Sequence, residues 1–249
     1  MIQVLLSLAA LAAVPAAAPT LRTDPPRTGV ELLGLMHERY AGRWYRTLTF
    51  VQKTTLADGK VETWYEAAEL PGKLRIDIAP LSDRNTLLFR NDSVYDFKAG
   101  KLAESKPLIH PLMVLGFDVY AQPVEVTIRQ LGSLGFDLAT LHESIWQGRP
   151  AYVVGAAAGD SVTRQFWIDK ERLVFVRMVE PGKQNPAARV ETQFNKYIAM
   201  GQGWLETEVR FMVNGETKML EEYTQPRAGM PLDPAIFDTR QWVPPGWIK

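Results

Sequence analysis

The stretch from Lys73 to Phe97 places the strongest constraint on the fold, because it predicts three short strands in a row. Leu74, Ile76 and Ile78 alternate with charged residues, a period of two that is typical of a strand with one buried face. Turn sequences separate this strand from the two that follow it. An antiparallel meander whose apolar side chains share one face needs a second layer that covers that face.

The rest of the chain repeats this pattern. Dipeptides such as Asp58-Gly59, Gln147-Gly148 and Asn214-Gly215 separate further segments of alternating apolar residues. Counting the turns gives about a dozen antiparallel strands, and so long a sheet tends to curl into a barrel or half-barrel. The sequence therefore predicts a mainly β fold, an incomplete antiparallel β-barrel. With 249 residues, we expect one large domain rather than two small ones.

Two segments predict helices. Thr28 and Glu31 stand at capping-box spacing before an apolar stripe that ends near Gly42, which predicts an amphipathic N-terminal helix. Between residues 106 and 138, apolar residues are too dense for a half-exposed strand, which indicates short helices. We interpret these as a lid over the sheet, with an ordinary pair of core helices as the alternative. The predicted lid residues are Leu112, Met113, Leu115, Phe117, Val119 and Tyr120.

The two ends of the chain differ in composition from the middle. Residues 1–18 have the apolar run and small terminal residues of a secretory signal peptide, cleaved near residue 18; a membrane-anchoring helix is the alternative. A Pro-rich linker, residues 19–27, follows, and residues 28–249 form the folded domain. From about residue 231, an aromatic tail rich in proline carries Phe237, Trp242 and Trp247, and we expect it to pack across an edge or mouth of the sheet.

Charge and reactive residues exclude several function classes. Basic and acidic residues number 28 each, so the chain has no basic field that favours nucleic acid. His37, His110 and His142 lie far apart, without the spacing of metal-ligand motifs. We find neither a nucleophile elbow nor a dinucleotide loop. We therefore expect no catalytic residues, no metal and no cofactor. The absence of cysteine leaves no thiol for lipid attachment, which favours a soluble protein of a bacterial periplasm.

The order of elements resembles the LolA-type periplasmic lipoprotein carriers and their relatives over residues 28–237. The segments that carry the resemblance are TFVQKTTLADG, ELPGKLRIDI, LLFRNDSVYDF, FWIDKERLVFVRM and EVRFMVNGE. The resemblance implies an incomplete antiparallel barrel that short helices close over an apolar cavity. In the carriers this cavity receives the acyl chains of a lipoprotein. The predicted cavity residues here are Leu48, Phe50, Tyr65, Leu74, Ile76, Ile78, Leu87, Phe89 and Tyr95.

One position departs from the carriers. They have an arginine that latches the lid before the proline of ELPGKLRIDI, whereas this chain has Leu70. Apolar contacts would then hold the lid, and we expect it to open more readily than a charged latch would allow.

The resulting functional hypothesis is a monomeric periplasmic carrier or binding protein. Its ligand would be a lipid, lipoprotein acyl chains or another hydrophobic molecule, and its partners could include a membrane-protein donor or acceptor. The alternative from another class is a periplasmic sensor or regulatory domain of the same fold that binds a protein partner. A hydrolase is a third hypothesis, which no motif supports.

The export hypothesis gives the first prediction. We expect the mature protein to begin close to Pro19 and to be recovered in the periplasmic fraction, because the apolar run is short and no cysteine follows it. N-terminal sequencing of that fraction measures this directly. Recovery of a protein that keeps Met1 in the membrane fraction would favour the anchoring helix instead.

Overall fold

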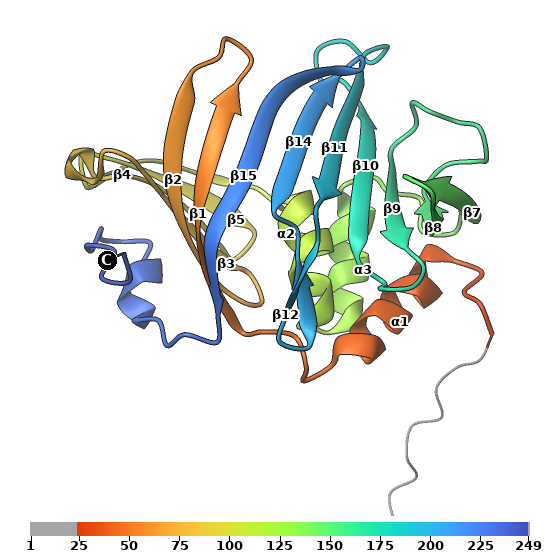
Figure 1. Ribbon diagram of the computed structural model, residues 1–249, viewed down its shortest axis with the longest axis horizontal. Helices are drawn as coiled ribbons and strands as arrows, with labels where there is room; N and C mark the ends of the chain where they lie inside the picture. The colour runs from red at the N-terminus through yellow and green to blue at the C-terminus, as the bar shows by residue number, and fades with distance from the viewer. Residues whose placement is uncertain (1–23, 249) are drawn as a thin grey trace, which may run out of the picture.

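The computed structural model describes residues 24–248, and within this range the fold is mainly β with three α-helices (Figure 1). The predicted signal peptide and residues 19–23 of the linker lie outside the described residues. No helix between residues 24 and 248 has both the length and the apolar composition needed to cross a membrane. The α-helices are α1 (Gly29–Tyr40), α2 (Pro111–Gly116) and α3 (Val124–Ser133), and the 3-10 helices are η1 (Leu81–Asp83), η2 (Asp118–Tyr120) and η3 (Pro234–Phe237).

Thirteen of the strands in this range form one antiparallel sheet, in the order β6-β5-β4-β3-β2-β1-β15-β14-β11-β10-β9-β8-β7. β12 and β13 pair with each other as a separate hairpin. The strands are β1 (Thr47–Leu56), β2 (Val61–Glu69), β3 (Lys73–Ile78), β4 (Asn85–Arg90), β5 (Ser93–Lys98), β6 (Lys101–Pro107), β7 (Leu141–Trp146), β8 (Arg149–Val154), β9 (Gln165–Asp169), β10 (Phe175–Pro181), β11 (Arg189–Asn195), β12 (Ile198–Met200), β13 (Gly203–Leu205), β14 (Glu208–Val213) and β15 (Glu216–Ala228).

The sheet consists of two meanders, β1 to β6 and β7 to β15, which the pairing of β1 with β15 joins side by side. Its two edge strands are β6 and β7, and among the described residues no pairing closes the sheet between them. The strand pattern around β3, β4 and β5 is therefore confirmed, and so is the incomplete antiparallel barrel.

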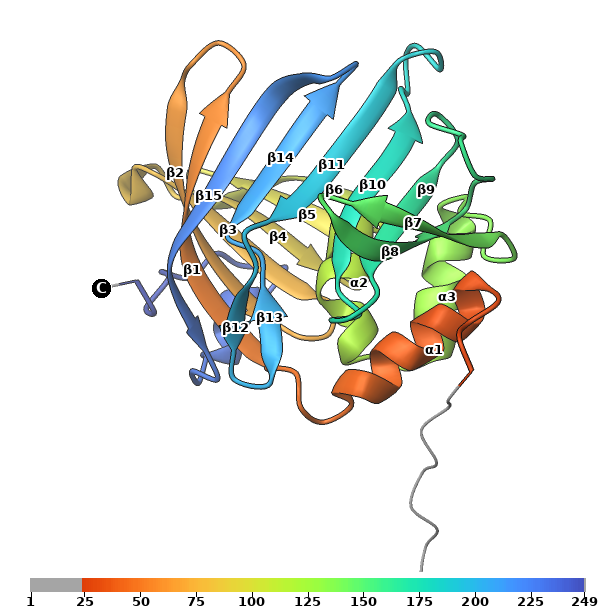
Figure 2. The ribbon, with the colours of Figure 1, turned by 45° about the vertical axis from the view of Figure 1, so that its right-hand side comes forward.

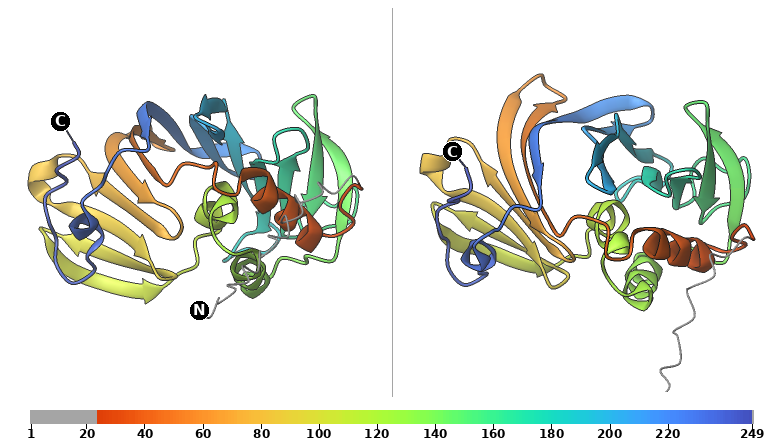
Figure 3. Two further views of the ribbon diagram at one scale, coloured as in Figure 1. Left: turned by 90° about the horizontal axis from the view of Figure 1, so that it is seen from below. Right: turned by 60° about the horizontal axis from the view of Figure 1, so that its bottom comes forward.

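The helices lie inside the curve of the sheet, as the views in Figures 2 and 3 show. The chain passes from one edge strand to the other through α2, η2 and α3, and α1 packs beside them. Thr28 caps α1 by accepting a hydrogen bond from the Glu31 backbone N–H at 3.2 Å, as the spacing predicts. Leu32, Leu33 and Met36 are fully buried in the main core that the helices share with the sheet.

The C-terminal tail covers the opposite, outer face of β2 to β5. Leu232, Ile236, Phe237, Trp242, Val243 and Trp247 pack there against Ala67, Leu88, Tyr95 and Phe97. Figure 1 shows the tail on the side of these strands away from the helices. The expectation that the tail crosses an edge or mouth of the sheet is therefore wrong, because the outer face of this meander is itself apolar enough to need a cover.

A buried ion pair holds the tail to the sheet. Arg75 donates from Nε and Nη2 to the two carboxylate oxygens of Asp77, at 2.8 Å each. The same guanidinium donates to the backbone oxygens of Ile236 at 2.9 Å and Val243 at 2.8 Å. Both charged residues are only 2% exposed. Their alternation with Leu74 and Ile76 predicts a solvated face, but the tail covers that face and supplies the hydrogen-bond acceptors.

Removing one member of this pair gives the second prediction. We expect Arg75→Ala to lower the free energy of unfolding by about 3–5 kcal/mol, because it leaves the Asp77 carboxylate and two tail carbonyls buried without the guanidinium. Urea denaturation measures the loss. Arg240→Ala is the matched control: Arg240 pairs with Asp238 in the same tail but its side chain is 87% exposed, so we expect little change in the free energy of unfolding. Equal losses for both variants would show that the buried pair does not hold the tail.

Candidate ligand-binding site

The lid segment, residues 112–120, presents one side to the main core. Val114, Leu115, Val119 and Tyr120 are at most 2% exposed and pack with α1 and with β8 to β11. Gly116 at the end of α2 lies so close to β11 that a Cβ atom there would come within 2.7 Å of the Phe194 ring. On this side the segment is packed as the core-helix alternative predicts.

The other side of the lid faces the first meander. Met113 of α2 packs against Ile76, Phe89 and Val94, which lie on the inner face of β3, β4 and β5. Around this small cluster the side chains are only partly buried: Trp64, Leu74, Ile78, Leu87 and Leu108. This part of the inner face is thus an apolar surface that the lid covers incompletely.

Leu108, just before α2, lies where two hollows and a polar cleft adjoin, since it lines all three. The first hollow, about 240 Å³, lies along Leu87, Phe89 and Val94 and has charged residues of β5 and β6 at its rim; we call it the β6 hollow. The second, about 440 Å³, lies between the start of α2, the end of α3 and the ends of β10 and β11; we call it the β10 hollow. Its lining is mainly apolar: Leu108, Ile109, Pro111, Leu134, Pro181 and Val190, with Ser133, Arg164, Glu180 and Lys183.

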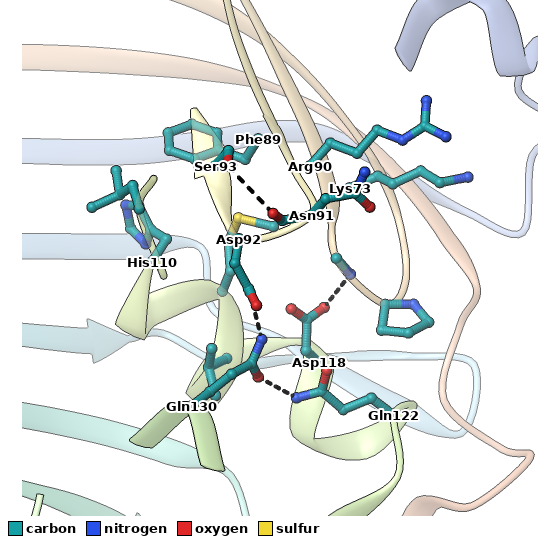
Figure 4. A pocket seen from close by; sticks show the side chains of 15 residues that line it. Lys73, Phe89, Arg90, Asn91, Asp92, Ser93, His110, Asp118, Gln122 and Gln130 are labelled. Carbon is teal, nitrogen blue, oxygen red and sulfur yellow. Dashed lines mark hydrogen bonds between the residues drawn. The ribbon is translucent and has the colours of Figure 1, made fainter. Parts of the chain in front are cut away.

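The polar cleft, about 180 Å³, lies between the helices and two turns of the first meander (Figure 4). The backbone N–H of Gly72, in the turn from β2 to β3, donates to Asp118 Oδ1 at 2.8 Å. Gln130 of α3 donates to Asp92 Oδ1, in the turn from β4 to β5, at 2.7 Å. Gln122 in turn donates to Gln130 at 2.8 Å. These bonds connect the helices to both turns across the cleft.

Burial shifts the pKa values of two side chains in this cleft, Asp118 and His110. It raises the pKa of Asp118 from 3.8 to about 7; the Gly72 N–H opposes this shift and the charge of Asp92 adds to it. Burial also lowers the pKa of His110 to about 4, so its imidazole is neutral near neutral pH. Within residues 24–248, His110 Nδ1 has no hydrogen-bond partner.

A second polar region lies at the centre of the inner face. Glu66, Glu206 and Glu221 are 5%, 1% and 8% exposed. Burial raises the pKa of Glu221 to about 7 and raises the pKa values of the other two well above the ordinary range. The charge of Glu221 raises the pKa values of Glu66 and Glu206 further. Tyr223 donates to Glu221 at 3.0 Å. These carboxyl groups therefore separate the apolar surface of β3, β4 and β5 from the main core under the helices.

The structure divides the predicted cavity residues into three groups. Leu74, Ile76, Ile78, Leu87 and Phe89 come together on the inner face with Met113. Leu48 and Phe50 also face inward but belong to the main core, with exposures of 0% and 3%.

Tyr65 and Tyr95 form the third group and lie on the outer face. Tyr65 is opposite Asp77 in the β2–β3 ladder, and Tyr95 is opposite Leu88 in the β4–β5 ladder. The interpretation that they face inward is therefore wrong. Both residues sit beside another apolar or aromatic residue, Trp64 and Val94, so the period of two does not decide which one points inward.

The predicted lid and latch residues are also divided. Met113 faces the first meander, whereas Leu115, Val119 and Tyr120 are main-core residues and Leu112 and Phe117 pack partly buried against that core. Leu70, at the latch position, is 2% exposed in the main core. The polar connection to the lid runs instead through Gly72 and Asp118, two and forty-eight positions further along the chain.

Sequence reasoning missed the residues around the polar cleft. Leu108 is one apolar residue in a dense run, and no spacing connects Asp92, Asp118 and Gln130. One signal was present: Asp118 is the only charged residue among residues 109–120. A lone carboxyl in an apolar segment needs a partner when the segment is buried, and the Gly72 N–H is that partner.

The fold of this chain is similar to that of several solved structures, although its sequence matches no known family. No family model matches the sequence, and no curated protein matches it. Three solved structures are similar in fold. A candidate outer membrane lipoprotein-sorting protein domain from Vibrio parahaemolyticus has a TM-score of 0.55 at 13% identity, over 84% of this chain and 96% of its own. A DUF1329 family protein from Desulfovibrio piger has a TM-score of 0.53 at 15% identity, over 84% and 95%.

The third structure is a LolA superfamily protein from Nitrosomonas europaea, with a TM-score of 0.50 at 11% identity, over 85% of this chain and 97% of its own. The chain has a LolA-like fold. The resemblance found in the sequence is thus confirmed for the fold, over nearly the whole length of each neighbour. At these identities a LolA-like fold carries no substrate with it, so the function has to be argued from the site.

The buried carboxyl of Asp118 gives the third prediction. The pKa of this carboxyl group is higher in the folded protein than in the unfolded chain, so the folded protein keeps the proton up to a higher pH. The contribution of Asp118 to the free energy of unfolding should therefore fall as the pH rises from about 4 through about 7. We expect Asp118→Asn to remove this fall and to be more stable than the wild type by up to a few kcal/mol at about pH 8, since one pH unit corresponds to about 1.4 kcal/mol.

Urea denaturation at a series of pH values measures the effect. The difference between the wild type and Asp118→Asn isolates Asp118, because Glu66, Glu206 and Glu221 titrate in both proteins. Asp83→Asn is the matched control, since Asp83 is exposed on η1. If the two stability curves stay parallel from about pH 4 to about pH 8, Asp118 does not keep its proton in the folded protein.

Proposed function

We propose that this protein is a binding protein or carrier for a lipid or another hydrophobic ligand, exported to the periplasm and acting as a monomer. The observation that carries the proposal is the apolar inner face of β3 to β5, which Met113 covers only in part and which adjoins two hollows. Each leucine-sized side chain that a ligand covers there contributes about 1.5–3 kcal/mol when fully buried. Several partly exposed side chains on one concave face can therefore hold an apolar chain without a charged contact.

The size and position of the hollows support the same proposal. The β10 hollow alone, about 440 Å³, falls within the range of about 300–1,000 Å³ that is usual for small-molecule sites. Leu108, just before α2, lines both hollows, so a ligand in one of them lies next to the other. The lipoprotein-sorting name of one structural neighbour is consistent with a lipid-like ligand.

The site favours binding over catalysis. Its inner surface is made of aliphatic and aromatic side chains. The carboxyl groups of the adjoining cleft, Asp118 and Asp92, each accept a hydrogen bond that connects structural elements. We propose that a membrane protein delivers or receives the ligand. A sensor of the same fold would instead form a stable complex with a membrane-protein ectodomain and bind no lipid.

A binding titration gives the fourth prediction. We expect the wild type to bind the neutral apolar dye diphenylhexatriene with an increase in fluorescence. Ile76→Glu should weaken this binding at least about tenfold, because it places a carboxyl group on the 7% exposed centre of the apolar surface.

Two further variants separate binding from folding. Leu87→Trp should fill the β6 hollow and weaken dye binding without burying a charge, because Leu87 lines that hollow. Ile145→Glu and Ile145→Trp are the matched controls, since Ile145 is 63% exposed on β7. If the wild type binds no dye, or if the Ile145 variants weaken binding as much as the Ile76 and Leu87 variants, the inner face is not the site.

A further inference from the structure

The polar cleft adjoins both apolar hollows, so it is the place where the polar end of an amphiphilic ligand would come to rest. Leu108 lines the cleft and both hollows, and Phe89 lines the cleft and the β6 hollow. A chain lying along the inner face of β4 would therefore reach the cleft without leaving apolar surface. The cleft can bind only a polar end that matches its unused hydrogen-bond donors, acceptors and charges.

The amide donors of Gly72, Gln122 and Gln130 in the cleft are already used within the protein. Gln122 Nε2 donates to Thr127 at 2.9 Å and to Gln130 at 2.8 Å. Gln130 Nε2 donates to Asp92 at 2.7 Å, and the Gly72 N–H donates to Asp118 at 2.8 Å. These three donors therefore point at protein acceptors and not at an anionic group of a ligand.

The cations that line the cleft are also engaged elsewhere. Lys73 Nζ bonds to Glu69 at 2.5 Å and lies 5.7 Å from the centre of the Phe237 ring on the outer face. Arg90 Nη1 donates to the backbone oxygen of Phe237 at 2.9 Å. Figure 4 shows both side chains extending away from Asp92, Asp118 and His110. Neither positive charge is directed into the cleft.

The acceptors, in contrast, are only half used. Asp118 is 3% exposed, and only its Oδ1 accepts a hydrogen bond. Asp92 also accepts through Oδ1 alone. His110, which lines the same cleft, has a buried Nδ1 without a partner among residues 24–248. Two carboxyl oxygens are thus available to one group that donates several hydrogen bonds, and the neutral His110 imidazole adds one nitrogen that can accept.

We infer that the ligand is an amphiphile with a primary ammonium group, which binds in the polar cleft between Asp92 and Asp118. Three N–H donors and one positive charge match two carboxyl groups, and charge-assisted hydrogen bonds of this kind are about twice as strong as neutral ones. The apolar chain lies on the inner face of β3 to β5. This inference rests on the proposed function and adds the chemical class of the ligand's polar end.

Three ligands with the same chain and different polar ends test this inference by isothermal titration calorimetry: decylamine, decanol and decanoate. At about pH 8 the amine is positive and the carboxylate negative. We expect decylamine to bind at least about tenfold more tightly than decanoate, with decanol between them. Ethanolamine, which has the ammonium group but no chain, should bind too weakly to measure.

The variants locate the ammonium group. Asp92→Asn and Asp118→Asn should each weaken decylamine binding about tenfold and change decanol binding less than about twofold. Asp83→Asn, an exposed carboxyl on η1, is the matched control and should leave all affinities unchanged. Thermal unfolding of each variant shows that it is folded.

The outcomes separate this inference from the proposed function. If decanoate binds as tightly as decylamine, or if the Asp92 and Asp118 variants weaken decanol and decylamine equally, the cleft does not hold an ammonium group although the hollows hold a chain. If none of the three chain compounds binds and diphenylhexatriene also fails, the proposed function is wrong and this inference is wrong with it.

Discussion

β1 and β15 pair from Leu48 opposite Ala228 to Leu56 opposite Met219, and this pairing joins two meanders into one sheet. It connects residues about 160 to 180 positions apart, so forming it costs much of the conformational entropy that the chain loses on folding. Without it, each meander would expose an additional long edge strand. With it, β6 and β7 become the two edges of one curved sheet, and the segment that connects them lies on the inner side (Figure 3). The lid belongs to this connecting segment.

The polarity of the inner face then limits where an apolar ligand can lie. At the centre, Glu66, Glu206 and Glu221 are buried, and burial raises the pKa of each carboxyl group. Charging such groups away from water is costly, so they favour their neutral forms up to a pH well above that of an ordinary glutamate. An apolar chain is thus better placed along β3 to β5, beneath Met113, than across the centre of the sheet.

Much of the fold could be predicted from local patterns, and the failures have a common cause. Leu74, Ile76 and Ile78 alternate cleanly with charged residues, so their face was predictable. Tyr65 and Tyr95 were assigned to the wrong face because neighbouring apolar residues blur the alternation in their strands. The decisive contacts come from the C-terminal tail, about 140 positions or more away, which buries the outer face and the Arg75–Asp77 pair. No local pattern contains that information. The polar cleft was not predictable for the same reason, since Asp92, Asp118 and Gln130 meet only in three dimensions.

The hydrogen bond between the lid and the sheet gives the cleft a group that can change its charge. The sequence has Leu70 where the LolA-type carriers have a latching arginine, and Leu70 is indeed buried in the core. A polar bond is still made in the same direction, since the sheet donates through the Gly72 N–H and the lid accepts through Asp118. The ionisable group of this bond, however, now lies on the lid. An arginine would stay charged at any physiological pH, whereas the carboxyl of Asp118 has a pKa of about 7 and changes charge near neutrality. On our proposal, a proton and a ligand ammonium group compete for this carboxyl, so the group that holds the lid in place would also sense whether the cleft is occupied.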